Sequence, residues 1–495
     1  MSPPCAGFLK DNLGKNKQNR VRLINKIRSL SSTMNLPLSD IDITSLVAEL
    51  SEISGNPVIT SESGREPYRR DESFHVARSP HAVVQPESAE EIQQIVIWCA
   101  KHKIPIVPRG AGTSLEGNCL AIQGGVCIDT VKMNKVIHIY QDDFHVVVEP
   151  GVTRRQLNEY LKGSGLFFPI DPGADATIGG MVATRASGTN AVLYGSMREN
   201  VINIEVVMAD GSLIRTAKRA PKSAAGYDLT RLMIGSEGTL GVFTELTIKL
   251  HPIPESILSA TCTYPTMEGA VNSVIDMHKC GIPVARVELL DEHTIRAVNQ
   301  YSKTNFEIAP TLFFEFHGSE LGVKEQVEVT GDIVKEHGGN GFVWVKNMED
   351  RNRMWRARHD VAYASKQLRP NGKIWATDVC VPVSKLAECI NETRKDIDES
   401  GILAPIVGHV GDGNFHLLLL VDHENPTEVQ AAEALHTRMV SRALELDGTC
   451  TGEHGIGYGK LEFLKTEHGD AVKPMQMIKQ ALDPHSIMNP GKIFA

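Results

Sequence analysis

Hydrophobic residues in the first half of the chain recur with the spacing of short strands and amphipathic helices. Strands are predicted at residues 81–84, 104–107, 126–129, 136–140, 145–149, 201–209, 213–216 and 242–250. Helices are predicted at residues 42–53, after a capping box of Ser88 and Glu91, and at residues 153–162. Long stretches at residues 55–80, 108–117, 171–195 and 235–241 lack either pattern. The first half is therefore predicted to combine helices and strands with long loops.

A different order of elements follows Pro252-Ile253-Pro254, which we take as a domain boundary. The pattern predicts strand 258–263, helix 267–278, strand 285–290, strand 312–316, helix 320–336 and strand 341–345. This β-α-β-β-α-β order is that of a ferredoxin-like motif. A helix at 348–364, a strand at 373–381, a helix at 384–398 and a hairpin at 402–421 indicate a second, partial copy. We therefore expect one broad, largely antiparallel sheet with helices on one side.

The predicted hairpin contains a glycine-rich turn with a histidine at either end, running from Gly408 to His416. The dipeptide Asp412-Gly413 favours a two-residue type I′ turn. That turn would place His409 directly opposite His416, close enough to share one metal ion. Two solvated histidines on a sheet face are the simpler alternative.

A second polar cluster at residues 449–455 favours the metal interpretation. Glu453 could supply an oxygen ligand and leave His454 free as a base. His454 could instead be a fourth ligand or the partner of a ligand.

Three glycine-rich loops, at residues 108–117, 171–195 and 235–241, contain few large apolar side chains. Closely spaced glycines allow backbone N–H groups to converge on an anion such as a phosphate. The spacing matches neither the Rossmann nor the Walker fingerprint, so a different nucleotide-binding architecture is required. An extended dinucleotide such as FAD, contacted by all three loops, fits this distribution.

Length and composition limit the remaining possibilities. A chain of 495 residues is expected to form two or three domains. Its nine cysteines are scattered singly, which indicates a reducing compartment and argues against structural disulfides and thiolate zinc sites. No apolar run reaches the roughly 18 residues needed to span a bilayer, so no transmembrane segment is expected.

Charge is unevenly distributed along the chain. The first 39 residues carry seven Lys and Arg against one acid, so removing their charge of +6 from the total of −9 leaves about −15 for the remainder. This balance argues against a nucleic acid as partner. The basic segment also has apolar residues that can line one side of a helix, which is typical of a mitochondrial transit peptide. A solvated basic helix is the alternative.

Six segments, in this order, resemble the FAD-dependent D-2-hydroxyacid dehydrogenases of the vanillyl-alcohol-oxidase flavoprotein superfamily. They are residues 108–117, 171–184, 235–241, 408–416, 452–459 and 488–492, and the likeness extends from about residue 60 to the C-terminus. The resemblance implies an α+β protein with a PCMH-type FAD-binding domain at residues 60–252. A C-terminal substrate and metal domain of ferredoxin-like origin would follow at 253–480, and residues 481–495 would return to the FAD. With a transit peptide at 1–39, the implied location is mitochondrial, in the matrix or associated with the inner membrane.

The resemblance places the FAD-binding residues mainly in the three loops. In the family the first two loops hold the pyrophosphate, the third contacts the adenosine half, and the residue matching Asn489 approaches the flavin. The residues so implied are Arg109, Gly110, Ala111, Gly112, Thr113, Ser114, Pro172, Gly173, Ala174, Ile178, Gly179, Gly180, Ala183, Thr184, Ser187, Gly188, Tyr194, Gly195, Glu237, Gly238, Gly241, Val242 and Asn489. Relatives with covalent FAD have a histidine in the first loop, which residues 108–117 lack, so non-covalent FAD is expected.

The resemblance also implies roles for the polar residues of the C-terminal half. His409, His416 and Glu453 match the ligands of a divalent ion, zinc or manganese. His454 matches the proposed catalytic base, and Arg358 matches a clamp for the substrate carboxylate. Arg358 has several charged neighbours and could instead be an ordinary surface residue.

The implied reaction oxidises a D-2-hydroxyacid to its 2-oxoacid by hydride transfer to FAD. Relatives specific for D-2-hydroxyglutarate carry threonine and lysine where this chain has Ala362 and Ala376, so D-lactate, giving pyruvate, or a longer aliphatic hydroxyacid is favoured. The alternatives are a D-2-hydroxyglutarate or glycolate dehydrogenase, and a flavin-binding subunit of a larger glycolate-oxidase-like complex. The expected electron acceptor is a carrier such as cytochrome c or an electron-transferring flavoprotein.

Overall fold

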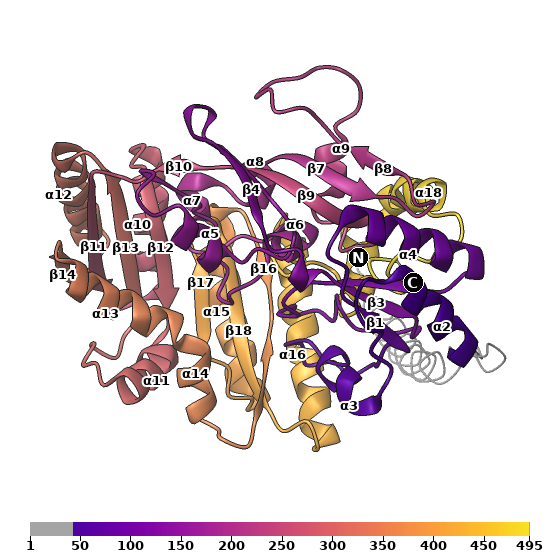
Figure 1. Ribbon diagram of the computed structural model, residues 1–495. Coiled ribbons are helices and arrows are strands. Elements are labelled where there is room, and N and C mark those ends of the chain that lie inside the picture. The colour runs from indigo at the N-terminus through magenta and orange to yellow at the C-terminus, as the bar shows by residue number, and fades with distance from the viewer. Residues whose placement is uncertain (1–42, 495) are drawn as a thin grey trace, which may run out of the picture. The chain divides into compact units, whose positions relative to one another are not determined.

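The computed structural model describes residues 43–494 (Figure 1). The predicted transit peptide, residues 1–39, lies outside the described residues. The chain divides into two units, residues 1–48 and 49–495. The first described element is helix α2 (Ile43–Ile53), and every later element belongs to the second unit.

The part of this unit before residue 253 contains two main sheets. A three-stranded parallel sheet has the order β1-β3-β2, and a five-stranded antiparallel sheet has the order β4-β5-β9-β7-β8. Their strands are β1 (Ala82–Val84), β2 (Ile106–Arg109), β3 (Val126–Asp129), β4 (Val136–Tyr140), β5 (His145–Val148), β7 (Val201–Val207), β8 (Leu213–Arg215) and β9 (Val242–Lys249). A further two-stranded pair joins β6 (Leu166–Phe167) to β10 (His251–Pro252). Every strand predicted in this half is present, with ends shifted by at most two residues.

Short helices connect these strands. They are α3 (Glu62–Arg65), α4 (Ala89–His102), α5 (Arg154–Tyr160), α6 (Ile178–Thr184), α7 (Ala191–Tyr194), α8 (Met197–Asn200) and α9 (Leu229–Met233). Helix α6 lies within the stretch predicted as an open loop, and its Ile178, Met181 and Val182 are buried in the core of this half. Three apolar side chains are enough to bury one face of so short a helix, which is why the low apolar content of the stretch concealed it.

The part after residue 252 is built on one broad sheet in which all paired strands are antiparallel. Its eight strands have the order β14-β11-β13-β12-β17-β18-β15, with β16 paired to β18. They are β11 (Ser256–Thr263), β12 (Val284–Leu290), β13 (Thr311–Gly318), β14 (Asn340–Val345), β15 (Lys373–Ala376), β16 (Val379–Cys380), β17 (Ile406–His409) and β18 (Asn414–Val421). Numbered within the predicted motif, the first four strands follow the order 4-1-3-2 of a ferredoxin-like sheet, which confirms that prediction.

Helices cover both faces of this sheet, so the expectation of helices on one side was wrong. One face packs against α10 (Met267–Lys279), α12 (Glu320–Glu336), α15 (Val383–Ser400) and α16 (Pro426–Glu445). The other face packs against α11 (Glu292–Ser302), α13 (Met348–His359) and α14 (Val361–Gln367). The neighbours Phe313 and Phe314 of β13 are both fully buried, one in each core. Helices α17 (Leu461–His468) and α18 (Val472–Leu482) complete the C-terminal part.

Two predicted elements are interrupted in ways that matter for the site. The helix predicted at 348–364 breaks at Asp360, which ends α13 and precedes α14. The strand predicted at 373–381 breaks at Thr377-Asp378, between β15 and β16. Among the helices within residues 43–494, none has the length and apolar character of a membrane span.

Candidate functional site

The hairpin of β17 and β18 brings its two histidines together, but not in the predicted register. His409 pairs with Asn414, and His416 pairs with Val407. The turn holds four residues, 410–413, and within it only Gly413 has a positive φ, of 78°. A type I′ turn needs a positive φ at both central residues, so the predicted turn and the direct His409–His416 pairing were wrong. The histidines are diagonal neighbours on one face, with ring centroids 5.4 Å apart.

Glu453 lies at the meeting point of the two rings. Its Oε1 is 3.3 Å from Nε2 of His409 and 3.3 Å from Nε2 of His416. One ligand atom from each of the three residues lies within 4.8 Å of the other two. Two imidazole nitrogens and a carboxylate form a donor set that both zinc and manganese accept. The residues present therefore fit a divalent cation, although its binding stays a prediction.

The far nitrogen of each ring is held by an acceptor in the protein. His409 Nδ1 donates to Glu288 Oε1 at 2.7 Å, and His416 Nδ1 donates to the carbonyl oxygen of Thr377 at 2.9 Å. Such bonds fix the tautomer and aim Nε2 at a common point, as they do behind metal-binding histidines.

The acidic and basic side chains of this cluster stabilise one another's charged forms. Burial disfavours the charged ring of His409, but the carboxylates of Glu288 and Glu453 raise its pKa well above the ordinary value. Burial likewise opposes ionisation of Glu453, but His409 and His416 lower its pKa. The side chain of Glu453 is therefore ionised at neutral pH, as a carboxylate that holds a cation would have to be.

Asp378 positions the loop that carries Glu453 and His454, and sequence reasoning missed this role. Its Oδ2 accepts from the hydroxyl of Thr451 at 2.7 Å and from the backbone N–H groups of Glu453 and His454 at 2.9 and 3.0 Å. Burial works against this carboxylate, but nearby His454 and Lys460 hold the pKa of Asp378 well below its usual range. The carboxylate is fully buried at the break between β15 and β16, and the hydrogen bonds that it accepts offset the cost of burying its charge.

His454 lies beside the cluster as a neutral base. Its ring stacks on that of His416 with centroids 5.1 Å apart, and its Nε2 is 4.0 Å from Glu453 Oε1. Burial lowers the pKa of His454 to about 4, so the imidazole is uncharged at neutral pH and able to accept a proton.

Arg358 is part of the same network and is not a surface residue. Its side chain is 11% exposed, and its Nε and Nη2 donate to Glu288 Oε2 at 2.9 and 2.5 Å. Glu288 therefore joins Arg358 to His409. Arg358 Nη1 makes no hydrogen bond to any residue in 43–494, which leaves a donor for a substrate carboxylate. Glu288 lies in β12, and the sequence predicted it only as part of the strand at 285–290.

The first two glycine-rich loops lie side by side and offer free backbone donors. A Cβ atom at Gly110 would lie 2.1 Å from Thr177 Oγ1, so the loops touch there. The backbone N–H groups of residues 111–114 and 173–175 donate to no acceptor in the described part of the chain. Gly112 has a φ of 72°, which lets its loop curl. Two adjacent sets of unpaired N–H groups suit the pyrophosphate of a dinucleotide such as FAD.

The third loop contacts both the C-terminal segment and the residues that directly follow Glu453 and His454. Glu237 is buried and accepts from the N–H groups of Ile456 and Gly457 at 2.7 and 2.8 Å. Asn489 donates from Nδ2 to the carbonyl oxygens of Glu237 and Asn118 at 2.7 and 3.0 Å. Both predicted cofactor residues thus use their side chains on the protein, so FAD contacts from them would come from the backbone.

Three other predicted cofactor residues lie against other parts of the protein. Gly179 and Gly241 are explained by packing, because a Cβ there would lie 2.6 Å from Pro150 Cβ and 2.5 Å from Val206 Cγ2. The hydroxyl of Tyr194 lies 2.7 Å from Nδ1 of His317, at the C-terminal sheet. The roles of all predicted FAD-binding residues remain predictions.

Known proteins resemble this chain along most of its length. Residues 80–217 match the family described as FAD binding domain, and residues 253–493 match FAD linked oxidases, C-terminal domain. The chain is 49% identical over 454 residues to a probable D-lactate dehydrogenase, mitochondrial, of Danio rerio, covering 91% of each chain. It is 48% identical over 424 residues to a D-lactate dehydrogenase (cytochrome), mitochondrial, of Arabidopsis thaliana, covering 85% of this chain and 75% of the relative.

More distant relatives extend the comparison. A glycolate oxidase subunit GlcD of Bacillus subtilis is 33% identical over 440 residues, covering 88% of this chain and 93% of the relative. The solved structure of p-cresol methylhydroxylase with substrate bound superimposes with a TM-score of 0.75 at 20% identity, covering 91% of this chain and 96% of the other, and shows the same fold. The chain therefore belongs to the family of FAD-linked oxidases, in the group that contains the mitochondrial D-lactate dehydrogenases.

Proposed function

We propose that this protein is a mitochondrial dehydrogenase that oxidises D-lactate to pyruvate with FAD and a divalent cation. The observation that carries the proposal is the convergence of His409, His416 and Glu453 beside the neutral imidazole of His454. The names of the relatives from Danio rerio and Arabidopsis thaliana support the substrate and the location.

Each residue of the site has a part in this chemistry. When bound, FAD would accept the hydride from C2 of D-lactate and the cation would lower the pKa of the substrate hydroxyl. His409, His416 and Glu453 would hold the cation, and the N–H groups of residues 111–114 and 173–175 would hold the FAD pyrophosphate. His454 takes the hydroxyl proton at Nε2, the nitrogen nearest Glu453. Arg358 binds the carboxylate through Nη1 and so orients the C–H bond.

We extend the proposal to a cytochrome as the electron acceptor. The relatives from Arabidopsis thaliana, Kluyveromyces lactis and Saccharomyces cerevisiae carry the word cytochrome in their names. D-lactate should therefore drive reduction of cytochrome c by the purified enzyme, followed at its α-band. Reduction of an electron-transferring flavoprotein but not of cytochrome c would contradict this assignment and identify the flavoprotein as the acceptor.

Steady-state kinetics with four hydroxyacids tests the proposed substrate. We expect the highest kcat/KM for D-lactate, with lower values for glycolate, D-2-hydroxyglutarate and L-lactate. Ala376 is partly buried beside the core around Trp355 and would leave a distal carboxylate without a cation. Ala362 is exposed on α14 and therefore does not count against such a carboxylate. A preference for D-2-hydroxyglutarate would contradict that argument, and a preference for glycolate would favour the function named for the Bacillus subtilis relative.

Replacing Glu288 by glutamine should weaken both the carboxylate clamp and the cation site. Gln has one acceptor oxygen and no charge, so it cannot satisfy Arg358 and His409 together as Glu288 does. We expect about a tenfold rise in KM for D-lactate and a loss of roughly 10- to 100-fold in cation affinity. The change Glu292→Gln, at a neighbouring glutamate that is 37% exposed, serves as control. Wild-type KM and cation affinity in the Glu288 variant would refute its positioning role.

A further inference from the structure

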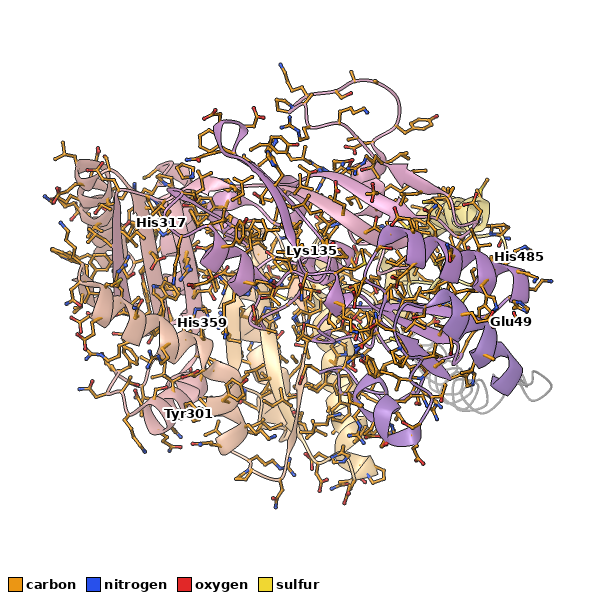
Figure 2. The ribbon with its side chains drawn as sticks, viewed as in Figure 1. Glu49, Lys135, Tyr301, His317, His359 and His485 are labelled. Atoms are coloured by element: carbon orange, nitrogen blue, oxygen red, sulfur yellow. The ribbon has the colours of Figure 1, made fainter. Side chains whose placement is uncertain are left out.

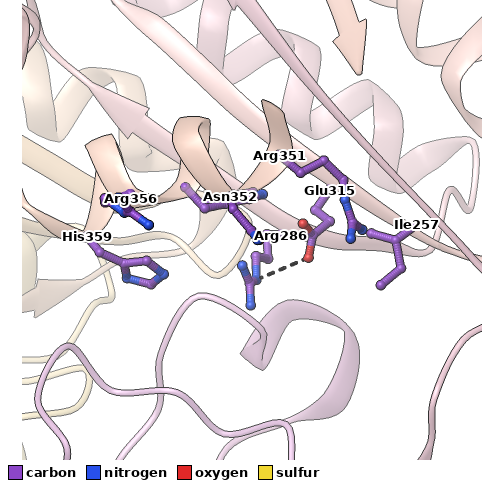
Figure 3. Close-up of a pocket in the computed structure, with 8 residues that line it drawn as sticks. Ile257, Arg286, Glu315, Arg351, Asn352, Arg356 and His359 are labelled. Carbon is purple, nitrogen blue, oxygen red and sulfur yellow. Dashed lines mark ion pairs between the residues drawn. The ribbon is translucent and has the colours of Figure 1, made fainter. Parts of the chain in front are cut away.

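A cavity of about 460 Å³ lies beside the proposed reaction site (Figure 3). Arg351, Trp355, Arg356 and His359 reach it from α13, and Arg286 and Glu315 reach it from β12 and β13. Arg351, Trp355 and His359 are spaced by four residues and so share one face of the helix. Figure 2 labels His359, in α13, and His317, near the end of β13, and so shows where these two elements lie in the molecule.

The cavity has more positive charge than its own acids balance. Arg286 is compensated, since it lies 3.3 Å from Asp171 and 3.5 Å from Glu315. Arg351 and Arg356 form no ion pair with any residue in 43–494, and the buried Nε of Arg351 has no hydrogen-bond partner.

The two other arginines of α13 do form ion pairs. Arg353 pairs with Asp350 at 2.7 Å, and Arg358 pairs with Glu288 at 2.5 Å. The two arginines of α13 that do not line the cavity therefore have acid partners, Asp350 on the helix and Glu288 on β12, whereas the two that line it have none among residues 43–494. Arg353 supplies a matched control on the same helix.

The cavity is adjacent to the reaction site but distinct from it. Arg286 and Glu288 are two residues apart on β12, so they lie on the same face of the strand. Glu288 binds Arg358 and His409, whereas neither of these residues lines the cavity.

We propose that this cavity binds an anion that carries a carboxylate or phosphate group, with Arg351 and Arg356 as its main ligands. A guanidinium presents planar, paired N–H donors that match both groups. Trp355 packs against Arg286, whose guanidinium lies 4.7 Å from the ring and is already balanced by Asp171 and Glu315, so the uncompensated charge of the cavity is that of Arg351 and Arg356. The ligand is either a separate small anion or the distal carboxylate of an alternative dicarboxylic hydroxyacid, and only the second source rests on the proposed function.

Inorganic phosphate is the probe for a separate anion. The Tm of the holoenzyme is measured against phosphate concentration, with chloride keeping the ionic strength constant so that general screening cancels. We expect saturable stabilisation of the wild type and an apparent Kd about tenfold or more weaker in the double variant Arg351→Gln/Arg356→Gln. Arg353→Gln should behave as the wild type. Equal phosphate affinity in all three proteins, with no change in the substrate ratio described next, would overturn the proposal.

Substrate kinetics distinguish the two sources. If the cavity accepts a distal carboxylate, the ratio of kcat/KM for D-2-hydroxyglutarate to that for D-lactate falls about tenfold in the double variant and not in Arg353→Gln. If the ligand is a separate anion, this ratio is unchanged while phosphate affinity falls. The flavin spectrum and the Tm without phosphate show that each variant is folded, and Arg351→Lys/Arg356→Lys should restore part of the phosphate affinity. A protein that oxidises no D-lactate still gives the phosphate result, so failure of the proposed function is recognised separately.

Discussion

The substitution His454→Asn is expected to slow flavin reduction by D-lactate by about a thousandfold, within the range that removal of a general base produces. Asparagine keeps a polar side chain of similar size but cannot take the hydroxyl proton. The backbone N–H at this position would still donate to Asp378, so the loop should keep its place. Anaerobic stopped-flow absorbance measures the effect on the step in which flavin is reduced.

The control is His485→Asn, at an exposed histidine labelled in Figure 2. This variant should reduce its flavin at the wild-type rate, and both variants should retain full FAD. A rate within about fivefold of the wild type in His454→Asn would exclude His454 as the base, because even a weak general base contributes about a hundredfold. His454 would then be reassigned as a cation ligand or as a support for His416.

The substitution Glu453→Gln is expected to lower the affinity for the divalent cation by at least about a hundredfold. Loss of a residue that only hydrogen-bonds to a metal ligand already lowers metal affinity roughly 10- to 100-fold, and Glu453 is itself the proposed carboxylate ligand. Its Oε1 is the atom shared by the Nε2 atoms of His409 and His416. Metal analysis after dialysis against a chelator measures retention, and the rate of flavin reduction should fall with it.

Two comparisons separate ligand loss from a general defect in Glu453→Gln. Glu462→Gln, at a glutamate that is 70% exposed, should retain the cation. Excess zinc or manganese should restore part of the activity of Glu453→Gln, as expected for a weakened site in a folded protein. Full cation content in the dialysed variant would show that Glu453 is not a ligand.

The fold was predictable where hydrophobic alternation is simple. The ferredoxin-like order followed from strands such as β11 and helices such as α12, which have regular apolar faces. The helix at 348–364 was predicted, but its position on the second face of the sheet was not, although β13 carried the signal for a second layer. The run Leu312-Phe313-Phe314 is continuously apolar because both faces of the strand are buried, and such a run requires cover on both sides. Helix α11 was missed because its buried residues are few and interleaved with polar ones.

The site was predictable only where residues form a motif. The residues His409, His416 and Glu453 stand in glycine-rich clusters, and the structure brings them together as the sequence indicates. The register of the hairpin was not predictable from Asp412-Gly413, because the backbone of Asp412 does not adopt the positive φ that this dipeptide permits.

Single carboxylates within predicted strands carry no motif, so Glu288 and Asp378 were overlooked. A signal for them existed, because an acid in a largely apolar stretch must find a partner once it is buried. Glu288 finds Arg358 and His409, and Asp378 finds the loop of Glu453 and His454. The partners come from distant parts of the chain, which is why only the structure identifies them.

The central claim is that D-lactate reduces FAD in this protein with the help of a cation held by His409, His416 and Glu453. The most direct measurement is the anaerobic flavin absorbance on addition of D-lactate, before chelation, after chelation, and after zinc or manganese is returned. The account predicts bleaching by D-lactate but not L-lactate, its loss when metal analysis shows the cation removed, and its recovery when the cation is restored. Unchanged bleaching by D-lactate in protein shown to be free of the cation would contradict it.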